Sequence, residues 1–360
     1  MDGSLPFDGQ EKGGSMKALV KNAREPDAIH YMEIPEPTQG KSDLKIRIAA
    51  CGICGTDLHL LQDTYPSCPP VVIGHEFSGV VETVGGEVQN FRTGDRVVAL
   101  TAVETCETCV WCLSGHHMLC DKRRSIGSGR HGGFAEYIVV PEKYAFPIPD
   151  QISLEEAALC EPLACVCRAL CEQVSIIAGE YVLVAGAGVM GQLAAQVASA
   201  QGAVVLMTGL TKDAARFELA RKMGVQATIP VDVGDPIKEI QQKTQGRGPK
   251  IAIECSGSES SIRFCLQTLM KTGSLIQIAI PGKQVAVDMD LALYKEIRIL
   301  TSFASEYTSW EIALTLLKHR MVQMRPLISA VLPMSDWEEG FMRAAGKKEL
   351  KILLKPDATG

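Results

Sequence analysis

The sequence of 360 residues lacks any apolar run near the roughly 18 residues that would span a bilayer, and no signal-peptide pattern stands at its start. It also lacks a large excess of either charge, since 36 Lys and Arg face 42 Asp and Glu for a formal net charge of −6. A mildly acidic chain has no general attraction for nucleic acid or anionic lipid. We therefore expect a cytoplasmic protein that binds neither membranes nor nucleic acid.

Repeats and low-complexity segments are absent as well, and 46% hydrophobic with 22% charged residues is the composition of a folded globule. At roughly 100–200 residues per domain, the length predicts two or three domains. Residues 1–15 are rich in Gly and Asp and have no period, so we interpret them as a flexible N-terminal extension.

The rest of the chain changes character near residue 155. Before it, alternation such as Leu44, Ile46 and Ile48 and runs broken by Gly, Pro and Asp predict strands. After it, short apolar strands alternate with helical runs, which predicts a parallel, doubly wound sheet. The expected strands there are Tyr181–Ala185, Val204–Thr208, Ile251–Glu254 and Ser274–Ala279, and the expected helices are Gln192–Ala200, Asp213–Met223 and Ser260–Met270.

Thirteen cysteines are an odd number, which suits a reduced metal-binding protein better than a secreted disulfide framework. Four of them form a compact motif, Cys106-x2-Cys109-x2-Cys112-x7-Cys120. Four thiolates at this spacing can close a tetrahedron around Zn²⁺ and leave no open position. The Glu, Thr and Gly residues between them make a chance cluster of buried thiols a poor alternative, so we predict a structural zinc site.

A second group of potential zinc ligands lies upstream, in the segment from Cys51 through Cys54 to His59 and in the pair His75-Glu76. Three protein ligands plus water are typical of a catalytic zinc site. By themselves these residues are equally compatible with two core thiols and a hydrogen-bonded core histidine.

A glycine-rich segment stands between the strand expected at Tyr181–Ala185 and the following helix. In this position a GxGxxG motif indicates a dinucleotide site, because glycines permit the tight turn and the helix N-terminus meets the pyrophosphate. Its residues are Gly186, Ala187, Gly188, Val189, Met190 and Gly191.

Taken in order, these motifs resemble those of the zinc-containing medium-chain dehydrogenases, in the group of sorbitol (polyol), threonine and butanediol dehydrogenases. The resemblance runs from about residue 16 to 355 and implies an α/β protein that forms a homodimer or homotetramer. It implies a mainly-β, GroES-like catalytic domain from residues 16–157 and 291–360, with a Rossmann domain at 158–290 between them. The motifs that carry it are GICGTD, GHE, the four-cysteine lobe, GGFAEY (132–137), EPL (161–163) and GxGxxG.

The resemblance also assigns ligands to a catalytic zinc in addition to the structural one. It implies Cys54 rather than Cys51 as the cysteine ligand, together with His75, and it places Asp57 behind His75 as the residue that orients it. Polyol-type members use the Glu of GHE, here Glu76, whereas Glu161 stands where alcohol dehydrogenases carry a ligand cysteine. The sequence does not decide between the two glutamates.

The implied activity is hydride transfer between a secondary alcohol, polyol-like, and NAD(P). By similarity, the Thr56 hydroxyl takes the alcohol proton and passes it through the cofactor ribose toward His59 and solvent. L-threonine 3-dehydrogenase and 2,3-butanediol dehydrogenase are the alternatives within this class. A catalytically silent dinucleotide-binding protein is the alternative outside it.

Two departures from the sorbitol dehydrogenase pattern bear on specificity. In NAD-specific Rossmann folds an acidic residue at the end of the second strand binds the ribose hydroxyls, but this chain has Gly209 there. Because the cations Lys212 and Arg216 follow and could pair with a 2′-phosphate, we favour NADP over NAD. In the substrate region, Leu60 replaces an aromatic residue and Ala304 replaces an arginine, which puts glucitol itself in doubt. The residues expected at the cofactor ribose are Gly209, Thr211, Lys212 and Arg216, with Asp213 close to them.

Overall fold

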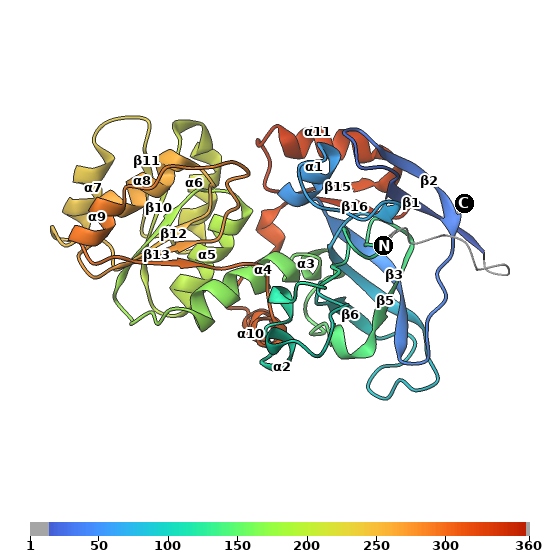
Figure 1. Cartoon of the computed structure of the whole chain (residues 1–360). Coiled ribbons are helices and arrows are strands. Elements are labelled where there is room, and N and C mark those ends of the chain that lie inside the picture. Colours follow the sequence, from blue (N-terminus) through green and yellow to red (C-terminus); the bar gives the residue numbers. More distant parts are fainter. Residues whose placement is uncertain (1–13, 358–360) are drawn as a thin grey trace. The chain divides into compact units, whose positions relative to one another are not determined.

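The computed structural model describes residues 14–357, which divide into two compact units. Of the described residues, the first unit comprises 14–161 and 327–357, and the second comprises 162–326 (Figure 1). The expected borders, 157/158 and 290/291, therefore differ from those in the structure. The proposed N-terminal extension lies outside the described residues except for its end, where Ser15 already begins strand β1 (Ser15–Lys21).

The first unit contains the strands predicted before residue 155. A three-stranded sheet has the order β2-β1-β4, and a seven-stranded sheet has the order β15-β16-β3-β5-β6-β8 with β7 also paired to β3. Leu44, Ile46 and Ile48 of β3 are all buried, as their alternation predicts. The bounds are β2 Ile29–Pro35, β3 Asp43–Gly52, β4 Val71–Val72, β5 Glu76–Val84, β6 Arg96–Ala99, β7 Tyr137–Pro141, β8 Ala145–Pro147, β15 Ile328–Pro333 and β16 Lys351–Lys355.

Strand β16 brings the C-terminal part of the chain beside the first cysteine motif. It pairs antiparallel with β3, so that Leu353 lies opposite Gly52 and Leu354 opposite Cys51. This pairing places Lys351, the first residue of β16, next to the loop that follows β3. The helices of this unit are short: α1 Gly55–Leu61, α2 Val110–Leu113, α3 Leu154–Ala157 and α11 Trp337–Ala345, and α4 Cys160–Cys167 crosses the border between the units.

The second unit is built on a six-stranded parallel sheet of order β11-β10-β9-β12-β13-β14, which confirms the doubly wound Rossmann-type fold. Strand β9 has the predicted bounds, Tyr181–Ala185. The other strands are β10 Val204–Gly209, β11 Ala227–Pro230, β12 Ile251–Glu254, β13 Ser274–Gln277 and β14 Arg298–Thr301. The helices are α5 Val189–Ala200, α6 Ala214–Lys222, α7 Pro236–Lys243, α8 Glu259–Thr268, α9 Met289–Tyr294 and α10 Tyr307–Lys318.

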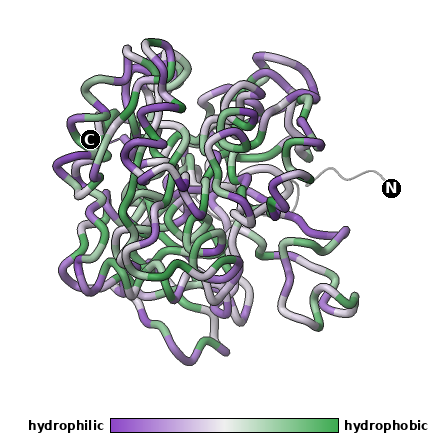
Figure 2. Tube along the Cα trace, turned by 90° about the vertical axis from the view of Figure 1, so that its left-hand side faces the viewer, coloured by the Kyte–Doolittle hydropathy of each residue, from purple (hydrophilic) through white to green (hydrophobic). Residues whose placement is uncertain are grey.

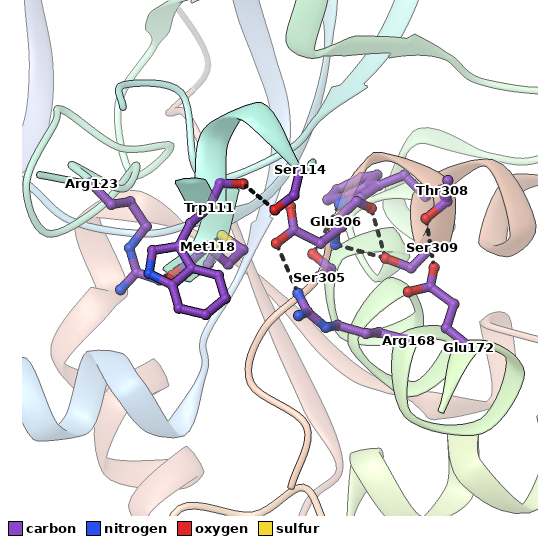
Figure 3. A network of polar contacts seen from close by, with 11 residues as sticks. Trp111, Ser114, Met118, Arg123, Arg168, Glu172, Ser305, Glu306, Thr308 and Ser309 are labelled. Carbon is purple, nitrogen blue, oxygen red and sulfur yellow. Dashed lines mark hydrogen bonds and ion pairs between the residues drawn. The ribbon is translucent and has the colours of Figure 1, made fainter. Parts of the chain in front are cut away.

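The second unit extends past residue 290 because two later elements belong to it. Strand β14 pairs with β13 in the parallel sheet, and α10 is tied to the π-helix Arg168–Glu172. Arg168 Nη1 lies 3.1 Å from Glu306 Oε1 in a pair that is almost fully buried, and the Thr308 hydroxyl donates to Glu172 at 2.8 Å (Figure 3). These contacts join segments more than 130 residues apart within the second unit.

Hydrophobic and hydrophilic residues are interspersed along the chain (Figure 2), and within residues 14–357 no helix has both the length and the apolarity to cross a membrane.

Candidate metal and cofactor sites

Three of the predicted ligands converge in the first unit. One donor atom each from Cys54, His75 and Glu76 lies within 4.8 Å of the others. Cys54 immediately precedes α1, whereas His75 and Glu76 stand where the loop after β4 enters β5. A thiolate, an imidazole and a carboxylate make a donor set that suits Zn²⁺ and leaves a fourth position for water or substrate.

Asp57 links the cysteine to the histidine. Its Oδ2 accepts from the Cys54 backbone N–H at 2.8 Å, and its own N–H donates to the Cys54 carbonyl at 3.1 Å, which sets the first turn of α1. The other oxygen, Oδ1, is buried without a hydrogen-bond partner among the described residues and lies 3.7 Å from His75 Nδ1. A carboxylate behind one ring nitrogen orients the other toward the metal position.

The charges around His75 favour its protonated, positively charged form. Burial by itself would lower the pKa of His75, but the charges of Asp57 and Cys54 outweigh burial and raise this pKa well above its ordinary value. An environment that stabilises a cationic ring also stabilises a metal cation placed next to it.

Glu76 is held from the opposite side by Lys351. The Lys351 ammonium lies 2.5 Å from Glu76 Oε2 and donates to the Ile53 carbonyl at 3.0 Å, and both side chains are buried. Gly52 leaves room for this pair, because a Cβ at that position would displace Glu76 Oε2. The lysine was not among the residues predicted for the site, and a charged residue opening the apolar strand Lys351–Lys355 is the one signal that points to it.

The two glutamates left open by the sequence differ in position. Among the described residues, the ligand cluster includes Glu76 and not Glu161. Glu161 is buried and close enough for its charge to contribute to the raised pKa of His75. The geometry therefore favours Glu76 as the third ligand and places Glu161 nearby.

Cys51 and Thr56 lie beside residues of the cluster, and His59 lies farther along the helix that begins after Cys54. Cys51 is fully buried, and burial followed by the charges of Asp57 and Glu76 raises the pKa of its thiol well above the ordinary value, which suits a core residue rather than a ligand. The Cys54 thiol donates to the Thr56 hydroxyl at 3.8 Å. His59 follows on the same helix, α1, with its ring half-buried.

The four-cysteine lobe converges as its spacing predicts. The sulfurs of Cys106, Cys109, Cys112 and Cys120 all lie within 4.8 Å of one another, with separations of 3.9 Å from Cys106 to Cys112 and 3.5 Å from Cys109 to Cys112. Zn–S bonds of about 2.3 Å in a tetrahedron require sulfurs about 3.8 Å apart. Hydrogen bonds from the backbone at Thr108 and Cys109 hold the pKa of Cys106 below its ordinary value, which favours the thiolate that binds metal.

The glycine-rich motif joins β9 to α5 in the second unit. Gly186 has φ +114°, which is strained for other residues, and a Cβ on Gly191 would collide with the Gly186 carbonyl. Gly188 caps α5, and a Cβ there would meet no atom within 4 Å. This open space before the N-terminus of a helix fits a pyrophosphate, next to Val189 and Met190 of the first turn.

Two aspartates shape the loop expected at the cofactor ribose. Arg216 Nη1 lies 3.3 Å from Asp213 Oδ1, and Thr211 donates to Asp232 from its backbone at 2.8 Å and its hydroxyl at 2.7 Å. Asp232, two residues after the end of β11, was not predicted to take part, because 21 residues separate it from Thr211. Lys212 is exposed, so of the two predicted cations it is the more available to a ligand.

A Cβ added at Gly209 would lie 3.0 Å from Asp213 Oδ2. An acidic side chain at position 209 would therefore lie close to the Asp213 carboxylate and be repelled by it. The glycine found at this position avoids that repulsion.

Comparisons with known proteins agree with this geometry. The family model "Alcohol dehydrogenase GroES-like domain" matches residues 40–150, and "Zinc-binding dehydrogenase" matches residues 189–319. The chain is 33% identical to a sorbitol dehydrogenase of Halalkalibacterium halodurans, covering 95% of this chain and 99% of that protein. It is 34% identical to an L-threonine 3-dehydrogenase of Bacillus velezensis, covering 96% and 100%.

Among solved structures, a zinc-binding dehydrogenase from Sinorhizobium meliloti 1021 bound to NADP superposes with a TM-score of 0.88 at 32% identity, covering 95% of this chain and all of that one. Matches of this length extend over both units. The chain thus belongs to the zinc-containing medium-chain dehydrogenase family and is a zinc- and NAD(P)-dependent alcohol oxidoreductase.

Proposed function

We propose that the enzyme oxidises a secondary alcohol that carries a neighbouring hydroxyl, a polyol or a small diol, to the corresponding ketone, with NADP as the preferred cofactor. The observation that carries this proposal is the convergence of Cys54, His75 and Glu76 on one point. An open-sided Cys-His-Glu set is suited to binding the oxygen of an alcohol beside the metal.

The chain's own residues then have defined roles. When bound, zinc supplies a Lewis acid that lowers the pKa of the alcohol hydroxyl, and NADP supplies the ring that accepts the hydride. Asp57 keeps His75 oriented, and the Glu76–Lys351 pair keeps the third ligand in place. Thr56, whose hydroxyl lies 3.8 Å from Cys54 Sγ, receives the alcohol proton, and His59 delivers it to solvent.

The substrate class follows from the relatives and from two side chains. Sorbitol and threonine dehydrogenases are similar over nearly the whole chain. Leu60 is fully buried and Ala304 has no group that could bind a distant hydroxyl, so contacts of a long polyol chain are missing. We therefore favour shorter polyols and diols over glucitol, with L-threonine and 2,3-butanediol as the competing substrates.

The preference for NADP rests on charge. Gly209 offers no carboxylate to the ribose hydroxyls, and the exposed Lys212 offers a cation to a 2′-phosphate. Asp213 pairs with Arg216, and Asp232 accepts hydrogen bonds from Thr211. Lys212 is therefore the residue that we expect to discriminate between NADP and NAD.

We further propose that the protein acts in the cytoplasm as a homodimer or homotetramer. All thirteen cysteines are free, as in a reducing compartment. Strand β14 is the edge of the six-stranded sheet, and Ile299 on it and Leu293 and Tyr294 on α9 are 39%, 70% and 77% exposed. An exposed edge with apolar neighbours is a surface that a second copy would cover. Light scattering coupled to size exclusion tests the assembly.

A zinc determination and a substrate panel test the proposed reaction. Two zinc ions per chain are expected for the enzyme, whereas one would indicate a silent protein with a structural site only. His75→Ala should abolish turnover of every alcohol in a panel of polyols, diols and L-threonine. NADP binding should remain measurable, because the dinucleotide motif lies in the other unit. An active His75→Ala protein containing one zinc per chain would contradict the proposal.

A further inference from the structure

Helix α1 ends in a turn that carries a second residue onto His59. The Thr64 backbone N–H donates to the His59 carbonyl at 2.9 Å, and the Asp63 N–H donates to the Leu60 carbonyl at 3.2 Å. Asp63 has φ +52°. These two bonds around a left-handed residue form a Schellman motif, which fixes the backbone of Thr64 against the last turn of the helix.

The Thr64 side chain then contacts the ring of His59. Thr64 Oγ1 lies 3.0 Å from His59 Nδ1 and 3.3 Å from the His59 carbonyl oxygen. A hydroxyl has one proton, and a carbonyl oxygen can only accept; when the Thr64 proton is donated to the His59 carbonyl, Oγ1 accepts from Nδ1–H. A neutral ring with its proton on Nδ1 keeps its accepting lone pair on Nε2.

The turn is anchored from strand β1 and the loop that follows it. Asp63 Oδ1 lies 2.9 Å from Arg24 Nε and 3.3 Å from the ammonium of Lys21, whose side chain is fully buried. Burial alone would raise the pKa of Asp63, but the hydrogen bonds from Arg24 and Lys21 outweigh it and lower this pKa below its ordinary value. A left-handed non-glycine residue persists where its surroundings hold it, and these two cations do so here.

We propose that Thr64 is a positioning residue that holds His59 as the Nδ1–H tautomer, so that Nε2 takes the proton released by alcohol oxidation. The inference rests on the relay role proposed above for His59. Thr64 is exposed and His59 half-buried, which suits the last step of a path that ends in water. The charged groups that the structure places at this turn are Asp63, Lys21 and Arg24, and both cations pair with Asp63.

The test compares Thr64→Val with Thr64→Ser, which retains the hydroxyl. In the oxidation of the best substrate from the panel, Thr64→Val should lower kcat about three- to tenfold and change its pH profile, whereas Thr64→Ser should stay within about twofold. Thr315→Val is the matched control, since Thr315 is an exposed threonine of α10 whose hydroxyl donates to the Glu311 carbonyl. It should leave kcat and the profile unchanged.

A direct readout is the tautomer itself, from ¹⁵N NMR of histidine-labelled protein with the His59 signal assigned through His59→Ala. Wild type and Thr64→Ser should show the Nδ1–H form at high pH, and Thr64→Val a mixture of the two tautomers. An unchanged tautomer and an unchanged pH profile in Thr64→Val would overturn the inference.

His59→Ala separates failure of this inference from failure of the relay. If His59→Ala leaves the pH profile of wild type, the relay itself is wrong and the inference fails with it. If His59→Ala changes the profile, the relay stands, and Thr64→Val added to it should cause no further loss. A full additional loss in that double variant would show that Thr64 acts otherwise than through His59.

Discussion

The ammonium of Lys351 lies 2.5 Å from Oε2 of Glu76, in a pair that is buried on both sides and joins positions 275 residues apart. Removing one partner of such a pair leaves a buried charge without compensation, at a cost of about 3–5 kcal/mol. Because Glu76 is also the proposed third zinc ligand, the pair connects the stability of the first unit to its metal site.

Lys351→Met should therefore lower the free energy of unfolding by about 3–5 kcal/mol, measured by chemical denaturation. Lys351→Arg, which keeps the charge, should lose less. Adding Glu76→Gln to Lys351→Met should recover part of the loss, since the buried charge is then gone. A Lys351→Met protein as stable as wild type would show that Glu76 does not depend on this cation.

Cys109→Ser should remove one of four sulfurs from the lobe and release its zinc. Structural zinc contributes folding free energy, so the variant should melt at a lower temperature and contain one zinc per chain instead of two. Cys165→Ser is a control, because Cys165 lies outside both clusters. Full thermal stability together with loss of the lobe's zinc would contradict the structural role.

Lys212→Ala should lower kcat/KM for NADP about tenfold to a hundredfold and leave kcat/KM for NAD nearly unchanged. The reason is that a hydrogen bond to a charged group contributes about 1.5–3 kcal/mol and only NADP carries the 2′-phosphate. Lys222→Ala is the control, since Lys222 is exposed and pairs with Glu218 at 2.7 Å on α6. Wild-type enzyme that prefers NAD by tenfold would show that Lys212 is only helix surface.

His131 should make the protein sensitive to mild acid. Burial, assisted by the charge of Arg130, lowers the pKa of His131 to about 4, and Nδ1 accepts from the Val72 N–H at 3.1 Å. In the unfolded chain the pKa of His131 is near 6.5, so as the pH falls the unfolded state binds the proton before the folded state does. Stability from the neutral ring is thus complete above about pH 6.5 and falls as the pH drops toward 4.

His131→Asn keeps an acceptor for Val72 but has no proton to take up. Between pH 7 and pH 5, the free energy of unfolding should fall by about 2 kcal/mol more in wild type than in this variant. Denaturant titrations at the two pH values measure the difference. Equal losses in both proteins would show that His131 is protonated in the folded state at pH 5.

Features that depend on short stretches of chain were predictable from the amino-acid order. The spacing of a motif nearly dictates its geometry when few residues separate its members. This holds for the four cysteines within residues 106–120 and for the glycines between β9 and α5. The burial of Leu44, Ile46 and Ile48 followed from a period of two in the same way. The family, its α/β fold and its two classes of site were predictable from these local patterns.

Features that depend on distant segments became visible only in the folded chain. The antiparallel pairing of β16 with β3 placed Lys351 against Glu76, and the pairing of β14 with β13 extended the second unit to residue 326. The contact between Asp232 and Thr211 arises likewise from the parallel neighbours β10 and β11. Strand register is set by packing over the whole sheet, and no local pattern in the sequence specifies which side chain will lie across from which.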